Sequence, residues 1–323
     1  MNSLVGVIVV TYNSSSFVIE TLESVYNQTW KEIELIITDD CSEDDTVAIC
    51  RKWLSEHNSR FVRSEIITSE KNTGVSANLN RGISASKSEW VSFPAGDDTL
   101  KEDCIEENMS WLRDHPEVRV LFSTVEVYND KIQPEQLIGR IPKEPFHPGS
   151  IMAPDRSAES QYKQLLISDR INFTPSAFIN REVILSLGGF DERFRMLEDY
   201  PMWLKLTMNG YRLHFMEKST VNYRQHSGAI NNTGQRIIVN PNYFRQELFR
   251  RIYIYPYLPI DLRLNSRFVW VVSQVFRWDK LNRDTAFNRV FHSILTLYIN
   301  PFRYFIWIRK RLIGNLKYNE FYQ

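Results

Sequence analysis

Ser92-Phe93-Pro94-Ala95-Gly96-Asp97-Asp98 places two adjacent carboxylates directly after a run of β-prone residues. Residues 89–93 predict a buried strand, and the small residues after them predict a turn. Open α/β sheets bind their ligands at the carboxyl ends of their strands. Neighbouring carboxylates repel each other unless water solvates them or a hard divalent cation bridges them. The stretch therefore predicts either a solvated acidic turn or a metal site, and the surrounding segments decide between these readings.

The composition is typical of a globular protein, but its charge is unevenly distributed. The 323 residues accommodate one large α/β domain with an appendage, or two domains. The formal net charge is +0, yet residues 241–323 contain 14 Lys or Arg against 5 Asp or Glu. The same segment holds 20 of the 42 aromatic residues. A basic, aromatic tail on an acidic body indicates that the tail has a partner of its own.

Sequence marks of export and of membrane insertion are not found. The cysteines, Cys41, Cys50 and Cys104, are odd in number and form no CxxC pair, which favours a reducing, cytoplasmic compartment. Residues 5–10 are apolar but lack a basic lead and a cleavage site, so they predict a first strand rather than a signal peptide. Because no run of about 18 uncharged apolar residues exists, no spanning helix is predicted.

Strand-like and helix-like segments alternate through the first half of the chain. Short β-prone runs are followed by segments whose apolar residues recur at helical spacing. This order predicts an α/β fold with a parallel sheet and right-handed crossovers. The predicted strands cover residues 5–11, 34–38, 62–68 and 90–94, and the predicted helices lie around residues 14–26, 47–54 and 75–85.

The pattern changes near residue 117. Residues 130–155 are rich in Pro and Gly and predict a loop, and the segments beyond Pro241 are helical and amphipathic. We therefore predict a first domain over residues 1–235 and a basic, aromatic-rich helical region over residues 236–323. The remaining predicted strands cover 118–127, 176–180, 211–215 and 220–224, and the remaining predicted helices cover 161–167, 181–187 and 200–208.

Two groups of polar residues follow the first two predicted strands. Thr11, Tyr12 and Asn13 come after the first strand, and Asp39 and Asp40 come after the second. Parallel strands bring both groups to the same edge of the sheet. An aromatic ring beside a carboxylate suits a flat base with an imide N–H. A plain strand-to-helix turn and an Asx turn are the alternatives.

A third group surrounds Gly74, which precedes a predicted helix. Gly74 permits a tight loop, and the free N–H groups of the following helix suit an anion. The stretch is neither a P-loop, because it lacks GKS or GKT, nor a GxGxxG fingerprint. Arg81 suits a phosphate or, equally, an exposed structural position.

Glu198, Asp199 and His226 complete the set of candidate residues. Asp199 at a helix N-terminus either caps the helix or acts as a general base toward a hydroxyl group. His226 follows the last predicted strand and precedes a Ser-Gly loop. A lone histidine is usually structural, but at this position it can complete a metal shell.

Together these segments resemble the family 2 glycosyltransferases, whose nucleotide-sugar-binding domain has the GT-A fold. The resemblance extends from about Val5 to His226. Its motifs have a specific order and spacing. They are Val9-Val10-Thr11-Tyr12-Asn13, Ile37-Thr38-Asp39-Asp40-Cys41-Ser42, Asn72-Thr73-Gly74-Val75-Ser76, Gly96-Asp97-Asp98, Gly188-Gly189-Phe190-Asp191 and Glu198-Asp199.

The resemblance implies a role for each matching position. Thr11, Tyr12, Asn13, Gly74 and Asp39 or Asp40 fall in motifs of the nucleotide site, where the base is usually uracil. Asp97 and Asp98 match the acidic motif that meets the ribose and a diphosphate-bound Mn²⁺ or Mg²⁺, and His226 matches a histidine near that metal. Asp199 matches the general base, and Gly188-Gly189 matches the turn beside the acceptor pocket.

Two positions depart from the family pattern. The family often has Asp-x-Asp-Asp at the metal motif, but Ala95 occupies the place of the first Asp. Asp97 therefore carries more of the predicted metal and ribose contacts. Leu79 occupies a place where many members have Arg.

The resemblance also implies a reaction. A metal-dependent hexosyltransferase would move a sugar from a nucleotide-sugar donor, usually a UDP-sugar, to a hydroxyl group with inversion. The acceptor would be a glycan or a lipid-linked molecule in the synthesis of a surface polysaccharide such as O-antigen or capsule. Two other readings remain: a sugar nucleotidyltransferase, and a non-catalytic nucleotide- or glycan-binding protein of the same fold.

The C-terminal segment mixes aromatic and basic residues, for example over residues 268–272 and 304–311. Such amphipathic helices suit the headgroup region of anionic membranes, which predicts a peripheral protein at the inner face of the cell membrane. A helical subdomain packed on the core and an oligomer contact are the alternatives. Nucleic acid is not a predicted partner, because bulky apolar residues separate the basic ones.

Overall fold

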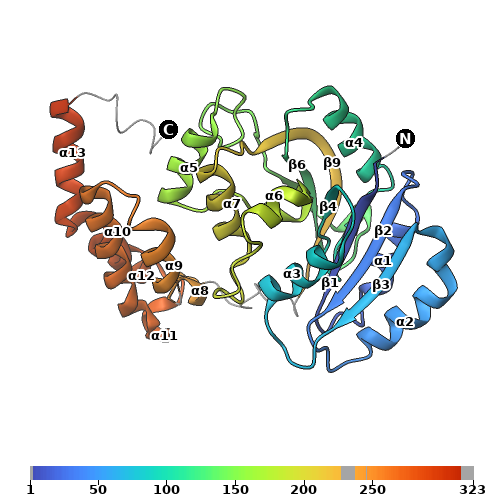
Figure 1. Cartoon of the computed structure of the whole chain (residues 1–323). Helices are drawn as coiled ribbons and strands as arrows, with labels where there is room; N and C mark the ends of the chain where they lie inside the picture. Colours follow the sequence, from blue (N-terminus) through green and yellow to red (C-terminus); the bar gives the residue numbers. More distant parts are fainter. Residues whose placement is uncertain (1–2, 227–236, 245, 314–323) are drawn as a thin grey trace. The chain divides into compact units, whose positions relative to one another are not determined.

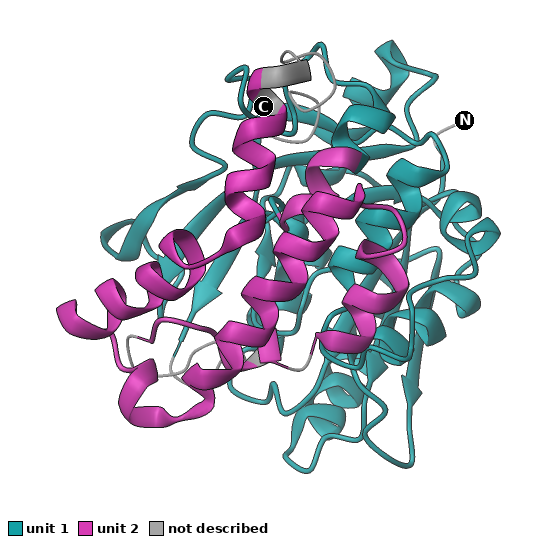
Figure 2. Cartoon of the chain, turned by 90° about the vertical axis from the view of Figure 1, so that its left-hand side faces the viewer, with its two compact units in different colours: residues 1–162, 170–226 teal, residues 163–169, 227–323 magenta. Residues whose placement is uncertain are grey.

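The computed structural model describes residues 3–226, 237–244 and 246–313. The chain divides into two compact units (Figure 2): unit 1 contains residues 1–162 and 170–226, and unit 2 contains residues 163–169 and 227–323. The predicted α/β class with a helical C-terminal extension is confirmed. The predicted boundary between residues 235 and 236 lies outside the described residues and stays a prediction.

The first four strands form the parallel half of the sheet in unit 1 (Figure 1). β1 (Val5–Thr11) lies between β2 (Ile33–Asp39) and β4 (Trp90–Ser92), and β3 (Arg63–Thr68) pairs with β2. All three pairs are parallel, as predicted. β1 and β2 are buried on both faces, which is why their sequences are continuous apolar runs without alternation.

Helices cover both faces of this half of the sheet. The chain proceeds from β1 to β3 in one direction and then returns to β4, so right-handed crossovers place α1 (Val18–Tyr26) and α2 (Thr46–His57) on one face and α3 (Val75–Ala85) on the other. Gly82 allows α3 to approach β1, because a Cβ there would lie 2.4 Å from Ile8 Cγ2.

The other half of the sheet is mixed and differs in part from the prediction. β8 (Phe178–Asn180) is antiparallel to β4 and to β6 (Val120–Asn129), whereas β9 (His214–Gln225) is parallel to β6. The two late strands predicted over 211–215 and 220–224 are therefore wrong as separate elements. Register shifts at residues 123–125 keep β6 paired with β9 through its polar middle.

The predicted loop over residues 130–155 contains a short strand, β7 (Leu137–Ile141), which forms a hairpin with β6. Its residues are all at least partly exposed, so no alternation of apolar and polar residues marked it in the sequence. The remaining elements of this part are β5 (Thr99–Leu100), α4 (Cys104–Asp114), α5 (Ala158–Ile167), α6 (Arg181–Ser186) and α7 (Asp199–Met208).

Unit 2 is helical around a small apolar core. Val239, Phe244 and Phe276 are buried together, and partly buried side chains such as Phe291 and Leu295 pack against them. The described elements are α8 (Pro241–Phe244), α9 (Glu247–Phe249), the π-helical turn η4 (Arg250–Ile254), α10 (Ile260–Ser273), α11 (Asp279–Asn282), α12 (Ala286–Ser293), the π-helical turn η6 (Ile294–Tyr298) and α13 (Pro301–Ile313).

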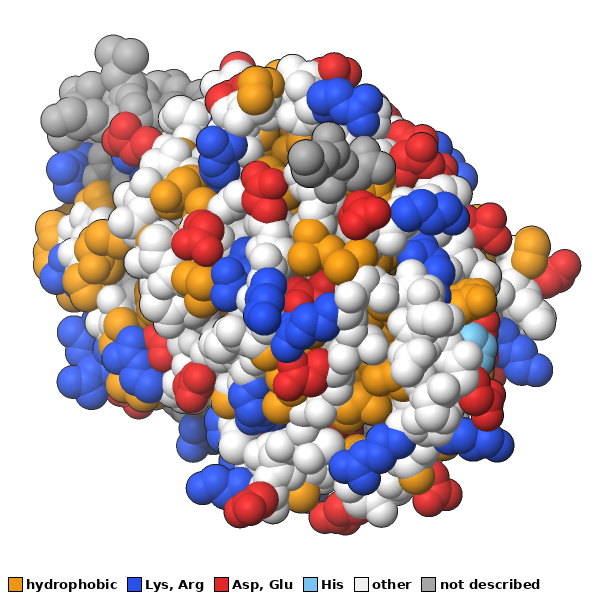
Figure 3. All heavy atoms as spheres, turned by 45° about the vertical axis from the view of Figure 1, so that its right-hand side comes forward, with side chains coloured by type: hydrophobic (Ala, Val, Ile, Leu, Met, Phe, Trp, Pro, Cys, Tyr) orange, Lys and Arg blue, Asp and Glu red, His pale blue; other side chains and the backbone are white. Residues whose placement is uncertain are grey.

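Charged and apolar side chains share the surface of the chain. The face displayed in Figure 3 has acidic and basic side chains interspersed with apolar ones. In unit 2 several large apolar side chains are exposed, among them Phe287 at 73%, Tyr298 at 67% and Phe305 at 62%. None of the described helices is long and apolar enough to cross a membrane.

Candidate active site

The carboxyl ends of β1 and β2 bring Thr11 and Asp39 together. The two residues are register partners, and the Thr11 hydroxyl donates to Asp39 Oδ2 at 2.8 Å. Asp39 Oδ1 also accepts a hydrogen bond from the backbone N–H of Ser42 at 2.8 Å. Both Thr11 and Asp39 are buried, whereas the neighbouring Tyr12 is 40% exposed. This strand end thus presents an accessible aromatic ring above a held carboxylate.

Asn13 connects the two loops that follow β1 and β2. Its backbone N–H donates to Ser42 Oγ, and its Oδ1 accepts from the N–H of Glu43. Its φ of 50° lies in the left-handed region, which Asn tolerates better than most residues. Asn13 therefore has a structural reason for its identity, and its predicted nucleotide contact stays a prediction.

Asp40 is turned into the protein, where it anchors the loop before α3. Its carboxylate accepts hydrogen bonds from the N–H groups of Thr73 and Gly74 and pairs with Arg81 at 2.8 Å. Burial alone would raise the pKa of Asp40, but the hydrogen bonds from Thr73, Arg81 and Gly74 outweigh it and hold the pKa below its usual value. Arg81 therefore holds Asp40 in place.

Gly74 is required where two distant segments cross. It has a φ of 96°, and a Cβ at this position would lie 2.7 Å from the carbonyl oxygen of Arg195. The backbone N–H of Val75 donates to that same oxygen at 2.9 Å. The Gly74 N–H already donates to Asp40, so the predicted anion contact of this residue is untested.

The acidic pair lies after β4, beside the end of β9. Asp98 is 1% exposed, and its Oδ1 accepts the backbone N–H of Arg224 at 2.9 Å. Burial and, second, the charge of Asp97 raise the pKa of Asp98 well above its usual value. Asp97 Oδ2 lies 3.1 Å from His226 Nε2. The structure therefore brings the three predicted metal ligands to one strand edge.

The donor atoms of these three residues are of the kinds that bind divalent cations, and their role as ligands stays a prediction. Within residues 3–226, 237–244 and 246–313, no three His, Cys, Asp or Glu side chains are already grouped as a metal site. Asp98, however, is a buried carboxyl beside a second carboxyl, and added positive charge would relieve its raised pKa. Carboxylate oxygens with an imidazole nitrogen suit Mn²⁺ or Mg²⁺, with phosphate oxygens and water completing the shell.

The sequence analysis did not single out Arg224 and Phe17, which support this edge. The side chain of Arg224 is 2% exposed, and it pairs with Glu20 at 2.6 Å and donates to the carbonyl oxygen of Asp97. The Phe17 ring lies 4.6 Å from the His226 ring and 4.6 Å from the guanidinium carbon of Arg224. Because Arg224 and His226 are two residues apart near the end of a strand, period-two alternation could have paired them.

Glu198 and Asp199 begin α7 with their carboxyls in a poorly solvated environment. Asp199 Oδ2 accepts a hydrogen bond from the Thr174 hydroxyl at 3.0 Å. Burial raises the pKa of Asp199, and burial together with the charge of Asp199 raises the pKa of Glu198 to about 7. Asp199 Oδ1 also accepts the backbone N–H of Tyr200, the second residue of α7, at 2.7 Å, so Asp199 is held both by its own helix and by Thr174.

Hydrogen bonds connect the segment before α7 to α3, the helix that follows Gly74. The Ser76 hydroxyl donates to the carbonyl oxygen of Phe194, and Val75 donates to that of Arg195. In the Gly188-Gly189 turn, a Cβ at Gly189 would lie 2.6 Å from Asn80 Oδ1, which accepts the N–H of Phe190. The residues leading to Asp199 are therefore fixed against the start of α3, which Asp40 also holds.

The raised pKa of Glu198 predicts a pH-dependent stability. Glu198 would ionise near pH 4.5 when unfolded and near pH 7 when folded, so the folded state binds more protons between these values. Its contribution to stability is therefore lost as the pH rises from about 4.5 to 7. We expect Glu198→Gln to gain stability over the wild type progressively across this window, measured by urea unfolding at several pH values. A difference independent of pH would contradict the raised pKa.

Comparison with known proteins adds the family. The sequence profile described as Glycosyl transferase family 2 matches residues 6–187, more than half of the chain. The chain belongs to glycosyl transferase family 2. The profile spans the motifs from Thr11 to the start of the Gly188-Gly189 turn, and α7 and His226 lie beyond it.

This family 2 chain has a curated relative and similar solved structures. It is 27% identical over 286 residues to chondroitin synthase of Escherichia coli, and the aligned region covers 87% of this chain and 37% of the synthase. The S. aureus TarS 1–349 structure in complex with UDP-GlcNAc has a TM-score of 0.58 at 17% identity, and the match covers 85% of this chain and 73% of that 1–349 chain. A mannosyltransferase of Pyrobaculum calidifontis, solved with GDP-Man and Mn²⁺, has a TM-score of 0.51 at 18% identity. The match covers 98% of this chain and 77% of the mannosyltransferase chain.

The two structural likenesses support the GT-A fold of the family 2 chain. The TarS and mannosyltransferase structures were obtained with a nucleotide-sugar, and the second also with Mn²⁺. The chain spans about a third of the length of chondroitin synthase, so the activity of that whole enzyme does not transfer to this chain.

Proposed function

We propose that this chain is a metal-dependent, inverting hexosyltransferase that uses a nucleotide-sugar, a UDP-sugar, as donor. The observation that carries the proposal is the meeting of Asp97, Asp98 and His226 at one strand edge of a family 2 chain. The TarS complex with UDP-GlcNAc and the mannosyltransferase complex with Mn²⁺ support it.

The nucleotide base would lie against Tyr12, with Asp39 accepting its imide N–H. Tyr12 is exposed enough to stack on a flat ring. Among the described residues, Asp39 has no cationic partner, whereas Arg81 already neutralises Asp40. A carboxylate has about four acceptor sites, so Asp39 keeps capacity for a ligand. We therefore assign base binding to Asp39 and a supporting role to Asp40.

Asp97, Asp98 and His226 would hold Mn²⁺ or Mg²⁺ together with the donor diphosphate. When bound, the cation supplies positive charge against the negative charge that grows on the leaving nucleoside diphosphate. Arg224 holds both aspartates in this arrangement. Its backbone N–H donates to the Asp98 carboxylate, and its guanidinium group donates to the carbonyl oxygen of Asp97.

Asp199 would accept the proton of the acceptor hydroxyl. The hydroxyl oxygen then bonds to the anomeric carbon, and the bond from that carbon to the diphosphate oxygen breaks with its electron pair leaving on the nucleoside diphosphate. Attack from the face opposite the diphosphate inverts the configuration. The Thr174 hydroxyl holds the carboxylate of Asp199 in place. The raised pKa of Asp199 makes this carboxylate a stronger base than that of an exposed Asp.

The acceptor would be a glycan or a lipid-linked sugar in polysaccharide synthesis. The likeness to chondroitin synthase over most of this chain supports a polysaccharide product. The exposed apolar and basic side chains of unit 2 support contact with a membrane surface, where a lipid-linked acceptor would lie.

One assay tests the proposal. Purified protein is incubated with a panel of nucleotide-sugars, with Mn²⁺ or with a chelator, and free nucleoside diphosphate is measured with and without a glycan acceptor. We expect release from at least one UDP-sugar with Mn²⁺ and none with the chelator. Equal release in both conditions would contradict the metal site. Binding without release from any donor would favour a non-catalytic protein.

A further inference from the structure

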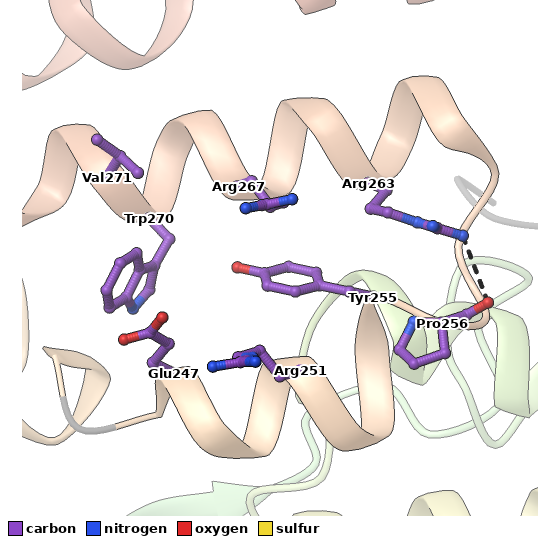
Figure 4. A pocket seen from close by; sticks show the side chains of 8 residues that line it. All are labelled: Glu247, Arg251, Tyr255, Pro256, Arg263, Arg267, Trp270 and Val271. Atoms are coloured by element: carbon purple, nitrogen blue, oxygen red, sulfur yellow. Dashed lines mark hydrogen bonds between the residues drawn. The ribbon is translucent and has the colours of Figure 1, made fainter.

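Unit 2 contains a cavity of about 650 Å³ that unit 1 does not line (Figure 4). One wall comes from α9, η4 and the residues after them, and the other comes from α10. Arg251, Arg263 and Arg267 line it, against the single carboxylate of Glu247. The cavity therefore concentrates positive charge in a confined space.

In the part of the chain that the structure describes, the three arginines have no ion-pair partner. Among the described residues, no carboxylate forms an ion pair with Arg251, Arg263 or Arg267, although Arg289 and Arg309 elsewhere in unit 2 are paired with acids. Arg251 and Arg267 are exposed, so an anionic ligand can reach their guanidinium groups. The cavity thus offers positive charge that an anion can pair with.

Two N–H groups at the cavity also lack acceptors. Arg263 is fixed by hydrogen bonds from its Nη2 to the carbonyl oxygens of Leu258 at 3.2 Å and Pro256 at 3.4 Å, yet its Nε is buried without a partner. The indole Nε1 of Trp270 is likewise buried without a partner. Buried donors without acceptors are uncommon in proteins, and each calls for a missing group.

Tyr255 organises the centre of the cavity. Figure 4 shows its ring between Arg251 on one wall and Arg267 on the other, with the hydroxyl pointing into the cavity. The guanidinium carbon of Arg267 lies 5.9 Å from the centre of the ring. Burial raises the pKa of Tyr255, so the hydroxyl stays a hydrogen-bond donor. The guanidinium groups of Arg251 and Arg267 flank this ring, whereas that of Arg263 reaches toward Pro256 at one end of the cavity.

The chemistry of the lining selects a phosphate. The planar fork of arginine matches two oxygens of a phosphate at once, which a lysine ammonium cannot do. Val271, which lines the cavity, is 60% exposed, and Ile260 and Leu248, which belong to the same helical segments but do not line it, are exposed at 59% and 50%. A ligand that satisfies both parts carries a phosphate on an apolar chain.

We propose that this cavity binds the phosphate or diphosphate headgroup of a membrane lipid. The inference deepens the membrane contact of the proposed function, but it involves no residue of the candidate active site. An anionic phospholipid and a lipid-linked acceptor share this chemistry, and the experiment below separates them from a soluble anion.

The test is co-sedimentation of the full chain with vesicles of neutral phosphatidylcholine that contain or lack phosphatidic acid. Arg251→Gln/Arg267→Gln is compared with Arg283→Gln/Arg303→Gln, which removes the same charge from exposed positions that do not line the cavity. We expect at least a roughly 10-fold weaker affinity for phosphatidic acid vesicles in the cavity variant and less than about 2-fold in the control. Equal losses in the two variants would overturn the proposal.

Two further arms keep the result decisive. Replacing phosphatidic acid by an isoprenoid diphosphate tests the acceptor lipid, and soluble pyrophosphate as competitor tests a free anion. Binding of pyrophosphate without binding to either vesicle would overturn the lipid part of the proposal. If the double Gln variant does not fold by circular dichroism, Arg267→Lys, which retains the charge but loses the fork, is expected to weaken vesicle binding by about 3-fold or more. Unchanged binding in that variant would overturn the arginine assignment.

Discussion

Asp199→Asn is expected to reduce sugar transfer by about 10²- to 10⁴-fold, which is the usual contribution of a positioned general base. An amide in the same place fills the same space and has one oxygen that accepts from Tyr200 or from Thr174, but it cannot take the proton of the acceptor hydroxyl. The measurement is the rate of product formation with donor and acceptor saturating. Affinity for the nucleotide-sugar should change little, because the substitution leaves the predicted donor residues intact.

Glu182→Gln on α6 is the matched control for Asp199→Asn. This substitution also replaces a carboxylate by an amide, but at a side chain that is 77% exposed. Among the described residues, Glu182 pairs only with Arg181. Its rate should equal that of the wild type. Turnover of Asp199→Asn within a few-fold of the wild type would remove Asp199 from the role of base and leave Glu198 as the next candidate.

Asp97→Asn is the second substitution with a large expected effect, a loss of about 10³-fold in kcat/KM with Mn²⁺. Metal stabilisation of a charged leaving group contributes several kcal/mol, and each 1.36 kcal/mol is about a factor of ten in rate. The substitution also removes the carboxylate that contacts His226. Isothermal titration of nucleoside diphosphate with and without Mn²⁺ should show the metal-dependent part of the affinity disappear.

Asp114→Asn at the end of α4 controls for the loss of one negative charge, because Asp114 is exposed and outside the candidate site. The Mn²⁺ dependence of this variant should match the wild type. If Asp97→Asn retained a Mn²⁺-dependent affinity, the metal ligands would have to be sought elsewhere, and the departure at Ala95 would gain weight.

The parallel half of the sheet was predictable because its strands are buried on both faces. β1 and β2 are written as continuous apolar runs, and their ends fall within one residue of the prediction. The continuity of β9 as a single strand was not predictable. Its pairing with β6 is long-range, and its bulged middle contains the polar residues Glu217, Lys218 and Ser219. Local patterns carry no information on such pairing.

The candidate site divides in the same way. Strand ends are local features, so Thr11 and Asp39, or Asp97 and Asp98, could be placed at an edge from the sequence. Which carboxylate is already neutralised could not be predicted, because the partner of Asp40 is Arg81, which is 41 residues further along the chain. The environment of Asp98 likewise depends on Arg224, which is 126 residues further along the chain.

The crossing of Gly74 and Arg195 has a consequence for protein engineering. Main-chain atoms set this contact, and only three residues separate Arg195 from Asp199. Under the proposed roles, the backbone of the sheet and of α3 therefore sets the distance between the leaving group and the proton acceptor. The long loop over residues 130–155 does not set it. A designer seeking a new sugar specificity can therefore randomise the exposed side chains of that loop while keeping its buried Ile151, Met152 and Ala153 and the Asp130 carbonyl that Arg224 contacts.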